Sequence, residues 1–337
     1  MATVKLRKAQ PYNLKINDMG ITIGIGRRSG GGASPSGLDL LFDNIANADI
    51  MISGNSSLVA DWNTFFNLPT NGTPFTSVTV AGNKISLFNG SGITLRNYLF
   101  GNNDPSGTSL LEVVDNAGCV VACGKGVFSD YNIGDGCYEL TKVHLSACVT
   151  LGDEVFNDCE KLSDLDLPFA SYTILGENVF NDVILLSQNY FTNLVTAGNY
   201  CFMWCTGLIT PDFSSLISAG VSCFERCTGL TTPDFSSLEL AGDDCFWGCT
   251  GLTTPDFSSL ISAGDSCFER CTGLINLDLS SCTSLGTTTG NDDVFRFIIG
   301  NIITLTVPVA LMICNGGAPD GDIAYLQANN TVTVIQV

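Results

Sequence analysis

The chain has 337 residues, of which 45% are hydrophobic and only 14% are charged, so it can bury a large core and must use Ser, Thr, Asn and Gly for much of its polar surface. Its formal net charge of −19 disfavours nucleic acid as a partner, because phosphate contacts need Lys and Arg. No apolar run approaches the roughly 18 residues that cross a bilayer, so we expect no membrane insertion, and the polar segment 1–17 lacks the apolar stretch of a secretory signal peptide.

Residues 1–110 show no internal repeat, and their patterns predict a small mixed, mainly β, N-terminal domain. Segment 19–26 alternates weakly between apolar and polar residues, as a strand does. Segments 38–45 and 58–68 have the apolar spacing of helices. The glycine-rich segment 30–37 is expected to be a flexible linker or loop.

Two alternating apolar runs flank the tetrapeptide at 81–84. Val78 and Val80 precede it, and Ile85 and Leu87 follow it. This arrangement predicts a β-hairpin. Because the character of the sequence changes near residue 110, we expect the N-terminal domain to attach the chain to a parent assembly, while the rest of the chain carries recognition.

Self-similarity with a period of 22 residues is the strongest signal in the sequence. The segment Cys-Thr-Gly-Leu starts at Cys205, Cys227, Cys249 and Cys271, and Pro-Asp-Phe-Ser-Ser-Leu starts at Pro211, Pro233 and Pro255. Superimposed copies share the spacing Leu-x-x-Leu-x-Leu, which turns alternate residues of a short strand inward. These copies predict a β-rich solenoid of leucine-rich repeats with short parallel strands over 111–313, in which 111–126 is a degenerate first coil.

Each coil also carries a glycine that marks a turn and a phenylalanine that we expect in the core. The glycines are Gly152, Gly176, Gly198, Gly220, Gly242, Gly264 and Gly286. The phenylalanines are Phe156, Phe180, Phe202, Phe224, Phe246 and Phe268. Because proline lacks the N–H that a strand ladder needs, the coils with Pro211, Pro233 and Pro255 should have very short or irregular strands.

Segment 314–337 is predicted to cap the solenoid, because it follows the last repeat-like coil. The pattern in this region predicts a strand near 303–307, a short helix near 320–328 and a closing strand over 331–337. A cap is needed because single coils cannot bury their apolar stripe, and the last coil has no following neighbour to cover it.

The repeated motif resembles that of BspA-like leucine-rich repeats, which have the pattern Ala-Phe-x-x-Cys-x-x-Leu. Counterparts run from Cys201 and Phe202 to Leu208, and again at each later period. The resemblance covers residues 126–313. It implies a right-handed parallel solenoid with roles in surface adhesion and recognition, and no enzymatic activity. The three prolines depart from this pattern, because they occupy an inward strand position.

The 15 cysteines are expected to be free thiols, most of which pack in the core. Cys201, Cys223, Cys245 and Cys267 share a repeat column with valines, and so do Cys159, Cys205, Cys227, Cys249 and Cys271. Valine replaces cysteine where the residue is a small buried hydrophobe. Pairs spaced Cys-x-x-x-Cys favour a zinc site only weakly, because valine in either column removes a ligand.

Outward-facing repeat positions form the predicted binding surface, which we call the outward strip. Its residues are His144, Asp166, Tyr190, Thr210, Asp212, Thr232, Asp234, Thr254, Asp256 and Asp278. The repeated Thr–Asp pair suits a regular partner, and Tyr190 is the best anchor, because an exposed aromatic residue buries a large area at low entropic cost. The alternative is that the aspartates only solubilise this face. Calcium on part of the Asp column is a weaker reading, and no other cofactor or metal is expected.

No catalytic site is predicted. His144 is the only histidine, so no Ser/His/Asp or Cys/His constellation can be argued. Paired carboxylates that hydrolyse sugars need two different environments, whereas the repeated aspartates have near-identical ones. We therefore predict that the chain is not an enzyme.

These features predict a non-enzymatic recognition and adhesion protein that binds a protein or glycan surface through its solenoid. The start at Met1 without a signal peptide and the near-identical coils favour a virion component, such as a phage tail or head decoration protein, made in the cytoplasm. The alternatives are a cell-surface adhesin and an intracellular protein-interaction scaffold, which reduced cysteines would suit. A carbohydrate-active enzyme is the least favoured reading, and the oligomeric state is left open.

Overall fold

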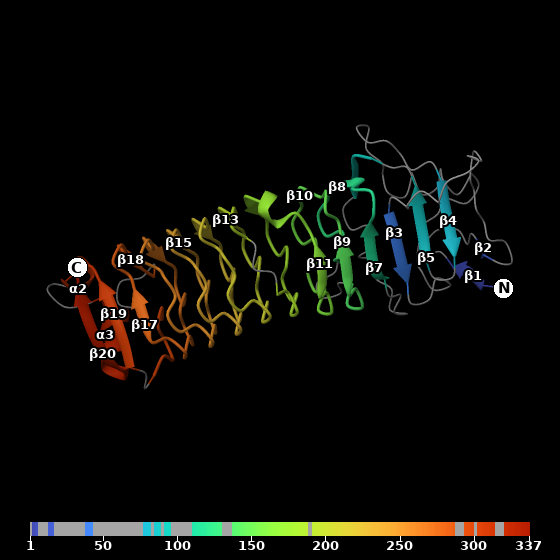
Figure 1. The fold of residues 1–337 in the computed structure, drawn as a ribbon. Helices are drawn as coiled ribbons and strands as arrows, with labels where there is room; N and C mark the ends of the chain where they lie inside the picture. Colours follow the sequence, from blue (N-terminus) through green and yellow to red (C-terminus); the bar gives the residue numbers. More distant parts are fainter. Residues whose placement is uncertain are drawn as a thin grey trace. The chain divides into compact units, whose positions relative to one another are not determined.

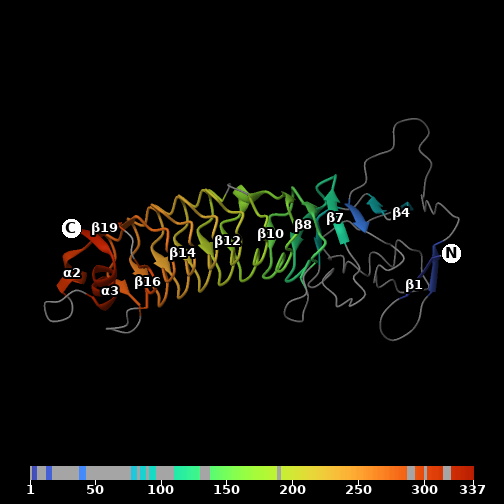
Figure 2. The same ribbon diagram turned by 90° about the horizontal axis from the view of Figure 1, so that it is seen from below.

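The computed structural model describes residues 2–5, 13–16, 38–42, 77–81, 84–88, 91–95, 110–129, 137–187, 191–286, 293–299, 302–313 and 320–337. The chain divides into two compact units, Met1–Pro168 (unit 1) and Phe169–Val337 (unit 2). Figures 1 and 2 show short strands that recur from coil to coil within each unit. In the part of the chain that the structure describes, no helix is long and apolar enough to cross a membrane.

Unit 1 contains a mixed six-stranded sheet. In spatial order its strands are β11 (Asp164–Asp166), β9 (Lys142–His144), β7 (Leu110–Asp115), β3 (Leu38–Phe42), β5 (Lys84–Phe88) and β4 (Ser77–Ala81). Strand β3 pairs antiparallel with β5 and β7, whereas β7, β9 and β11 run parallel. Strand β7 is therefore where antiparallel pairing gives way to the parallel pairing of stacked coils.

Two smaller groups of strands belong to the same unit. A parallel sheet has the order β10 (Thr150–Leu151), β8 (Val120–Cys123) and β6 (Ile93–Leu95). An antiparallel pair consists of β1 (Ala2–Lys5) and β2 (Asn13–Ile16). Because β8 pairs parallel with β10 and β7 with β9, residues 111–126 stack on the next coil as predicted, and the parallel pairing of β6 with β8 continues the stack to Ile93–Leu95.

The N-terminal predictions have mixed outcomes. The hairpin is confirmed, because β4 and β5 pair antiparallel with Ala81 opposite Lys84. The helix predicted over 38–45 is wrong, because its first residues form strand β3. Leu38 and Leu40 are fully buried there, and pairing on both sides of β3 overrides the helical spacing of a short apolar run. Three predictions lie outside the described residues, namely the strand 19–26, the linker 30–37 and the helix 58–68.

Unit 2 is built on a parallel sheet in which each coil contributes a two-residue strand. Its strands are β12 (Ile174–Leu175), β13 (Thr196–Ala197), β14 (Ser218–Ala219), β15 (Leu240–Ala241), β16 (Ser262–Ala263) and β18 (Ser284–Leu285). The register repeats the sequence period, with Ser218 opposite Leu240 and Leu240 opposite Ser262. The second residue of each strand is buried, so the sheet seals one side of the core.

The prolines have the predicted effect on the strands. Coils with Val143, Leu165 or Leu277 at the inward position form the three-residue strands β9, β11 and β17 (Asn276–Asp278). At the equivalent positions of the coils with Pro211, Pro233 and Pro255, the structure shows only an isolated parallel bridge between Asp212 and Asp234. The missing proline N–H accounts for the loss of the ladder.

Two columns of stacked phenylalanine rings fill the core of unit 2. One column contains Phe180, Phe202, Phe224, Phe246, Phe268 and Phe295, and the other contains Phe191, Phe213, Phe235 and Phe257. Within a column the rings are nearly parallel, with 5.4 Å between the centroids of Phe224 and Phe246. Between columns they meet at an angle, which is 61° for Phe224 and Phe235. Both geometries are favourable, and the predicted inward phenylalanine column is confirmed.

The described cysteines are all free thiols, and all except Cys137 are buried, as predicted. Burial raises the pKa of the cysteines in the two repeat columns, to about 12 for Cys223. Cys249 donates a hydrogen bond from Sγ to the carbonyl of Phe224 in the preceding coil, at 3.0 Å, and Cys227 and Cys271 repeat this contact. This column therefore joins neighbouring coils by hydrogen bonds as well as by packing. Cys314 lies outside the described residues.

The predicted elements of the C-terminal region are confirmed. A three-stranded parallel sheet has the order β17, β19 (Ile302–Val307) and β20 (Thr331–Gln336). The helices α2 (Val309–Ile313) and α3 (Gly321–Asn329) lie between β19 and β20 in the chain. The side chain of Asp320 caps α3 by accepting a hydrogen bond from the backbone N–H of Asp322. Buried Ile323 and Leu326 place the inner face of α3 in the core.

Candidate functional site

In unit 1 the strip residue His144 lies beside an ion pair between Lys142 and Asp164. His144 on β9 and Asp166 on β11 are register partners. His144 Nε2 lies 2.6 Å from Asp164 Oδ1, and Lys142 Nζ lies 3.2 Å from Asp164 Oδ2. The hydrogen bond with His144 holds the pKa of Asp164 below its ordinary value, and Lys142 acts in the same direction. The side chains here neutralise one another in part.

In unit 2 each aspartate of the strip closes a turn in its own coil. Oδ1 of the aspartate accepts a hydrogen bond from the N–H of the serine two residues later, at 3.0 Å for Asp212, Asp234 and Asp256 and at 2.9 Å for Asp278. Such Asx turns are a local preference of Asp and Asn. The Asp column therefore has a structural role that the repeat pattern alone did not reveal.

The same aspartates keep one oxygen for solvent or a ligand. Within the described residues, Oδ2 of Asp234 and of Asp256 accepts no hydrogen bond, and the neighbouring Thr232 and Thr254 are exposed. In the described ranges, no group of three or more His, Cys, Asp or Glu side chains is placed to hold a metal ion. Calcium on this column thus stays a hypothesis without a described coordination set. Tyr190, the predicted anchor, lies outside the described residues.

A second, partly exposed array does not follow from the repeat columns, and it lies in unit 2 just before the Cys-Thr-Gly-Leu segments. We call it the Trp–Arg ladder, and it consists of Trp204, Arg226, Trp247, Arg270, Phe297 and Arg296. The guanidinium carbon of Arg226 lies 4.4 Å from the ring centroid of Trp204 and 4.5 Å from that of Trp247. That of Arg270 lies 5.1 Å from Trp247 and 4.7 Å from Phe297. Because Trp247 comes from the coil between the two arginines, the arginines and rings alternate along the stack.

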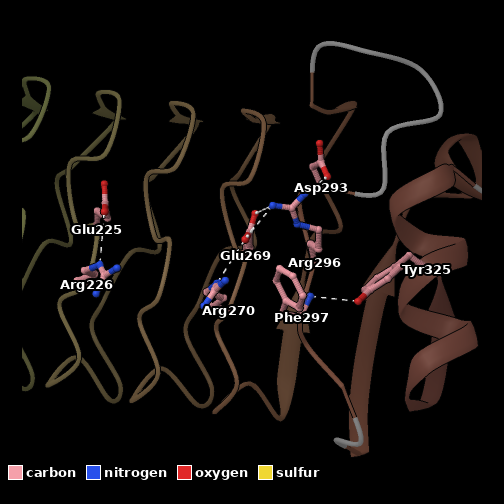
Figure 3. A network of polar contacts seen from close by, with 8 residues as sticks. All are labelled: Glu225, Arg226, Glu269, Arg270, Asp293, Arg296, Phe297 and Tyr325. Carbon is pink, nitrogen blue, oxygen red and sulfur yellow. Dashed lines mark hydrogen bonds and ion pairs between the residues drawn. The ribbon is translucent and has the colours of Figure 1, made fainter.

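Carboxylates fix the arginines of the ladder to different degrees (Figure 3). Glu225 and Glu269 reach only Nε of their neighbours Arg226 and Arg270, at 3.7 and 3.4 Å. Arg296 instead uses both terminal nitrogens, because Nη2 lies 3.3 Å from Glu269 and Nη1 lies 3.2 Å from Asp293. Glu269 is only 3% exposed, so it is a buried charge shared by two arginines.

The end of the ladder is tied to the C-terminal helix. The backbone N–H of Phe297 donates a hydrogen bond to Oη of Tyr325 on α3, at 3.1 Å. Figure 3 shows Tyr325 reaching from the helix toward Phe297. Phe297 is 44% exposed, and its ring centroid lies 4.7 Å from the guanidinium carbon of Arg270 and 5.1 Å from that of Arg296. The last aromatic residue of the ladder is thus held in place by its backbone.

The backbone explains why the ladder forms at this position. Arg226 and Arg270 have φ of 57° and 62°, and their N–H groups donate to carbonyls of the next coil, from Arg226 to Trp247 at 2.7 Å and from Arg270 to Arg296 at 2.9 Å. Gly248 takes the same position in the coil between, with φ of 69°. A Cβ at Gly248 would lie in contact with Cγ of Arg226, at 3.4 Å, and the positive φ favours glycine at this position.

A signal for the ladder was present in the sequence. The segment Cys-Phe-Glu-Arg starts at both Cys223 and Cys267, which are two periods apart, and Arg226, Arg270 and Arg296 are the only basic residues of 169–337. The array does not form one repeat column, because Trp247 occurs one position earlier in its coil than the arginines do in theirs. Only the structure shows that this offset places the ring between them.

The comparisons with known proteins agree with the architecture. A model of the BspA type leucine rich repeat region matches residues 130–253 and 198–311. No curated protein sequence matches the chain. Repeats of this family generally form protein-binding surfaces and are not catalytic.

Three solved structures are similar to parts of this chain. A leucine-rich repeat protein from Bacteroides ovatus is 15% identical, with 77% of this chain and 90% of that chain covered and a TM-score of 0.30. A leucine rich cell surface protein from Faecalibacterium prausnitzii is 14% identical, with 76% and 86% covered and a TM-score of 0.32. A leucine rich repeat protein from T. pallidum is 16% identical, with 70% and 87% covered and a TM-score of 0.28.

The two matched ranges overlap and together span residues 130–311. They contain the coils with the outward strip of unit 2 and the coils with the Trp–Arg ladder. Because the match covers more than half of the 337 residues, this chain belongs to the BspA-type leucine-rich-repeat family.

Proposed function

We propose that this chain is a non-enzymatic recognition protein that contacts its partner through the outward strip of unit 2. The observation that carries the proposal is the Thr–Asp pair that recurs on three successive coils, with Thr232 and Asp234 in the middle one. Stacked coils lie about 4.8 Å apart, so the pair presents the same groups at a constant interval. Such a surface suits a partner with a regular structure, such as a protein array or a glycan.

The proposal assigns different tasks to the parts of the chain. Residues 111–313 carry recognition, 314–337 cap them, and 1–110 attach the chain to its parent assembly. Family membership favours a cell-surface adhesin over a virion component, because the resemblance implies surface adhesion and no observation bears on a capsid or a tail. The second candidate is an intracellular interaction scaffold, which the free buried thiols favour, because disulfides are rare in the cytosol.

The test is to add charge to the strip without touching its turns. Thr232→Lys combined with Thr254→Lys places two bulky cations on the strip and leaves the hydrogen bonds of Asp234 and Asp256 intact. Binding of the full chain to immobilised extracellular-matrix proteins and neutral polysaccharides is measured by biolayer interferometry. We expect the double variant to lose at least about tenfold in affinity for every probe that the parent binds.

Two further variants separate the alternatives. Asp234→Asn with Asp256→Asn keeps the side-chain oxygen that closes each turn and removes only the charge. Ser218→Lys with Ser262→Lys adds the same two cations to β14 and β16, away from the strip. If the lysines on the strip bind like the parent, or if the β14 and β16 control loses as much, recognition lies elsewhere.

A further inference from the structure

In the Trp–Arg ladder, the edges of the guanidinium groups and of the aromatic rings are accessible to a ligand. Arg226 and Arg270 lie against the ring of Trp247 from the preceding and following coils, so the faces of these groups cover one another. What remains is the guanidinium edge, which carries N–H donors, and the ring edge, which is the positive part of the aromatic quadrupole. The arginine side chains are 40% and 50% exposed. Both kinds of edge attract an anion.

The arginines of the ladder are not equivalent as anion receptors. Within the described residues, Nη1 and Nη2 of Arg226 and of Arg270 have no carboxylate partner, because Glu225 and Glu269 reach only Nε. Both terminal nitrogens of Arg296 are already taken by Glu269 and Asp293. Two guanidinium groups therefore present a pair of donors in a fixed plane, which matches the two oxygens of a carboxylate.

The surroundings of the ladder limit how much negative charge a ligand can carry. Residues 169–337 contain 16 acidic and 3 basic residues. Burial raises the pKa of Asp244 above its ordinary value, and the nearby Glu225 and Glu269 raise it further. A densely charged polyanion would meet these carboxylates along its whole length. A ligand with sparse charges, placed only where the arginines are, avoids that repulsion.

The spacing of the arginines narrows the ligand further. Arg226 and Arg270 hold the same position in coils two apart, so their donors are about 10 Å apart along the stack. Side chains on the same face of an extended peptide recur about every 6.7 Å, and this distance matches neither the spacing of adjacent coils nor twice that spacing. A helical peptide docks through an apolar stripe in an apolar groove, whereas the ladder presents guanidinium and ring edges. In a linear glycan with an acidic group on every second sugar, the charges recur at close to the arginine interval.

We propose that the Arg226–Trp247–Arg270 part of the Trp–Arg ladder, without Arg296, binds a linear acidic polysaccharide with one carboxylate per disaccharide, with Arg226 and Arg270 each holding one carboxylate. Trp247 is a positioning residue, because both guanidinium groups lie over its ring, at 4.5 and 5.1 Å from the centroid. This site differs from the outward strip in residues and in ligand chemistry, and it does not depend on the strip being a binding surface.

The test measures binding of the full chain to hyaluronan octasaccharide, which has one carboxylate per disaccharide, by calorimetry at low salt. Arg226→Gln and Arg270→Gln are each expected to reduce the affinity about tenfold, because a hydrogen bond to a charged group is lost in each. Arg296→Gln is the matched control and should bind like the parent. Thermal unfolding of each variant establishes that it is folded before binding is compared.

Three outcomes would overturn the proposal. The first is a parent that does not bind the octasaccharide at low salt. The second is affinity that is the same in Arg226→Gln, Arg270→Gln and the parent. The third is equal binding of poly-L-glutamate, which identifies an acidic-peptide site, or of neutral dextran, which shows that charge is irrelevant. In support, the gain in affinity from disaccharide to octasaccharide should be present in the parent and lost in either single variant.

Discussion

Residues with positive φ shape one side of every coil in unit 2. Besides the ladder position, Ser222 and Asp244 have φ of 50° and 54°. The left-handed region costs a non-glycine residue roughly 1–2 kcal/mol. Here the N–H of each donates to the next coil, from Ser222 to Asp243 and from Asp244 to Asp265, both at 2.8 Å. The sequence could not show these positions, because Tyr, Ser and Asp all occupy them and the backbone of the neighbouring coil sets the conformation.

Asp244 gives a prediction about pH. Because burial and nearby acids raise its pKa, the folded state binds this proton more tightly than the unfolded state does. Stability should therefore fall as pH rises from the ordinary Asp pKa, 3.8, to the raised one, and the penalty is complete above it. Asp244→Asn should raise the free energy of unfolding at pH 7, and the gain should shrink as pH falls toward 3.8.

Urea unfolding of the parent and of Asp244→Asn across this pH range measures the effect. Asn tolerates the same positive φ, so the backbone is not the variable. Ser266→Asn is the control at the equivalent position one coil later, where φ is also 54°. Its stability difference from the parent should not vary with pH. A difference between Asp244→Asn and the parent that is constant with pH would contradict the prediction.

At the scale of the element, the phenylalanine columns act as continuous supports of the coils. Phe246 is fully buried between Phe224 and Phe268, at centroid distances of 5.4 and 5.6 Å. Its removal leaves a cavity that its neighbours cannot close, because rings above and below are fixed by their own coils. Phe246→Ala should therefore destabilise the protein by about 3–5 kcal/mol, measured by denaturant unfolding. Leu240→Ala, on the exposed side of β15, should change stability by only about 0.5 kcal/mol.

The proline coils show how one missing N–H changes an element. Residues near Pro233 lack the strand that Leu165 and Leu277 sit in, although the outward aspartates keep equivalent positions. Changing Pro211, Pro233 and Pro255 to leucine together should extend a parallel ladder through these coils. Hydrogen exchange should then show the new amide at 233 as protected as that of Leu165. Exchange that stays fast there would mean that packing, and not proline, prevents the strand.

Several elements could be predicted from the sequence because period and burial are local properties of a repeat. The inward phenylalanines, the free thiols, the β4–β5 hairpin and the β19–α3–β20 cap belong to this class. The two-residue strands such as Ser218–Ala219 do not, because Ser and Ala have no preference for strands and pair only since the stacked coils align them. Strand β3 was missed for a related reason, because its partners β5 and β7 are distant in sequence.

The candidate sites divide in the same way. The outward position of Asp234 and Thr232 follows from the repeat, but the Asx turn that uses the aspartate depends on where the chain bends. The Trp–Arg ladder required knowledge of which coil lies on which, and of the one-residue offset of Trp247. Sequence periodicity therefore identifies residues at equivalent positions of successive coils. It does not identify clusters of side chains that come from different positions in neighbouring coils.

At the scale of the whole molecule, charge is distributed unevenly along the chain. Of the 14 basic residues, only the three arginines of the ladder belong to 169–337, where 16 residues are acidic. Binding of any anion to unit 2 must therefore depend on close contact with the ladder, because the longer-range field is repulsive. That repulsion is screened within about 10 Å at 0.1 M salt. Moderate salt therefore weakens both the attraction of an anion to the arginines and its repulsion by the acidic residues.

The constant register of β13 to β16 also bears on how this protein can evolve. Each coil presents the same donors, acceptors and rings to its neighbours, so any of these coils can be stacked on any other. A deletion or duplication of one 22-residue unit in the gene therefore creates no new kind of interface between neighbouring coils. Loss of the unit 227–248 would bring Arg226 next to the coil of Arg270 without the ring of Trp247 between them. Recombination can thus change the length of the array and the spacing of its arginines in a single step, while the fold remains intact.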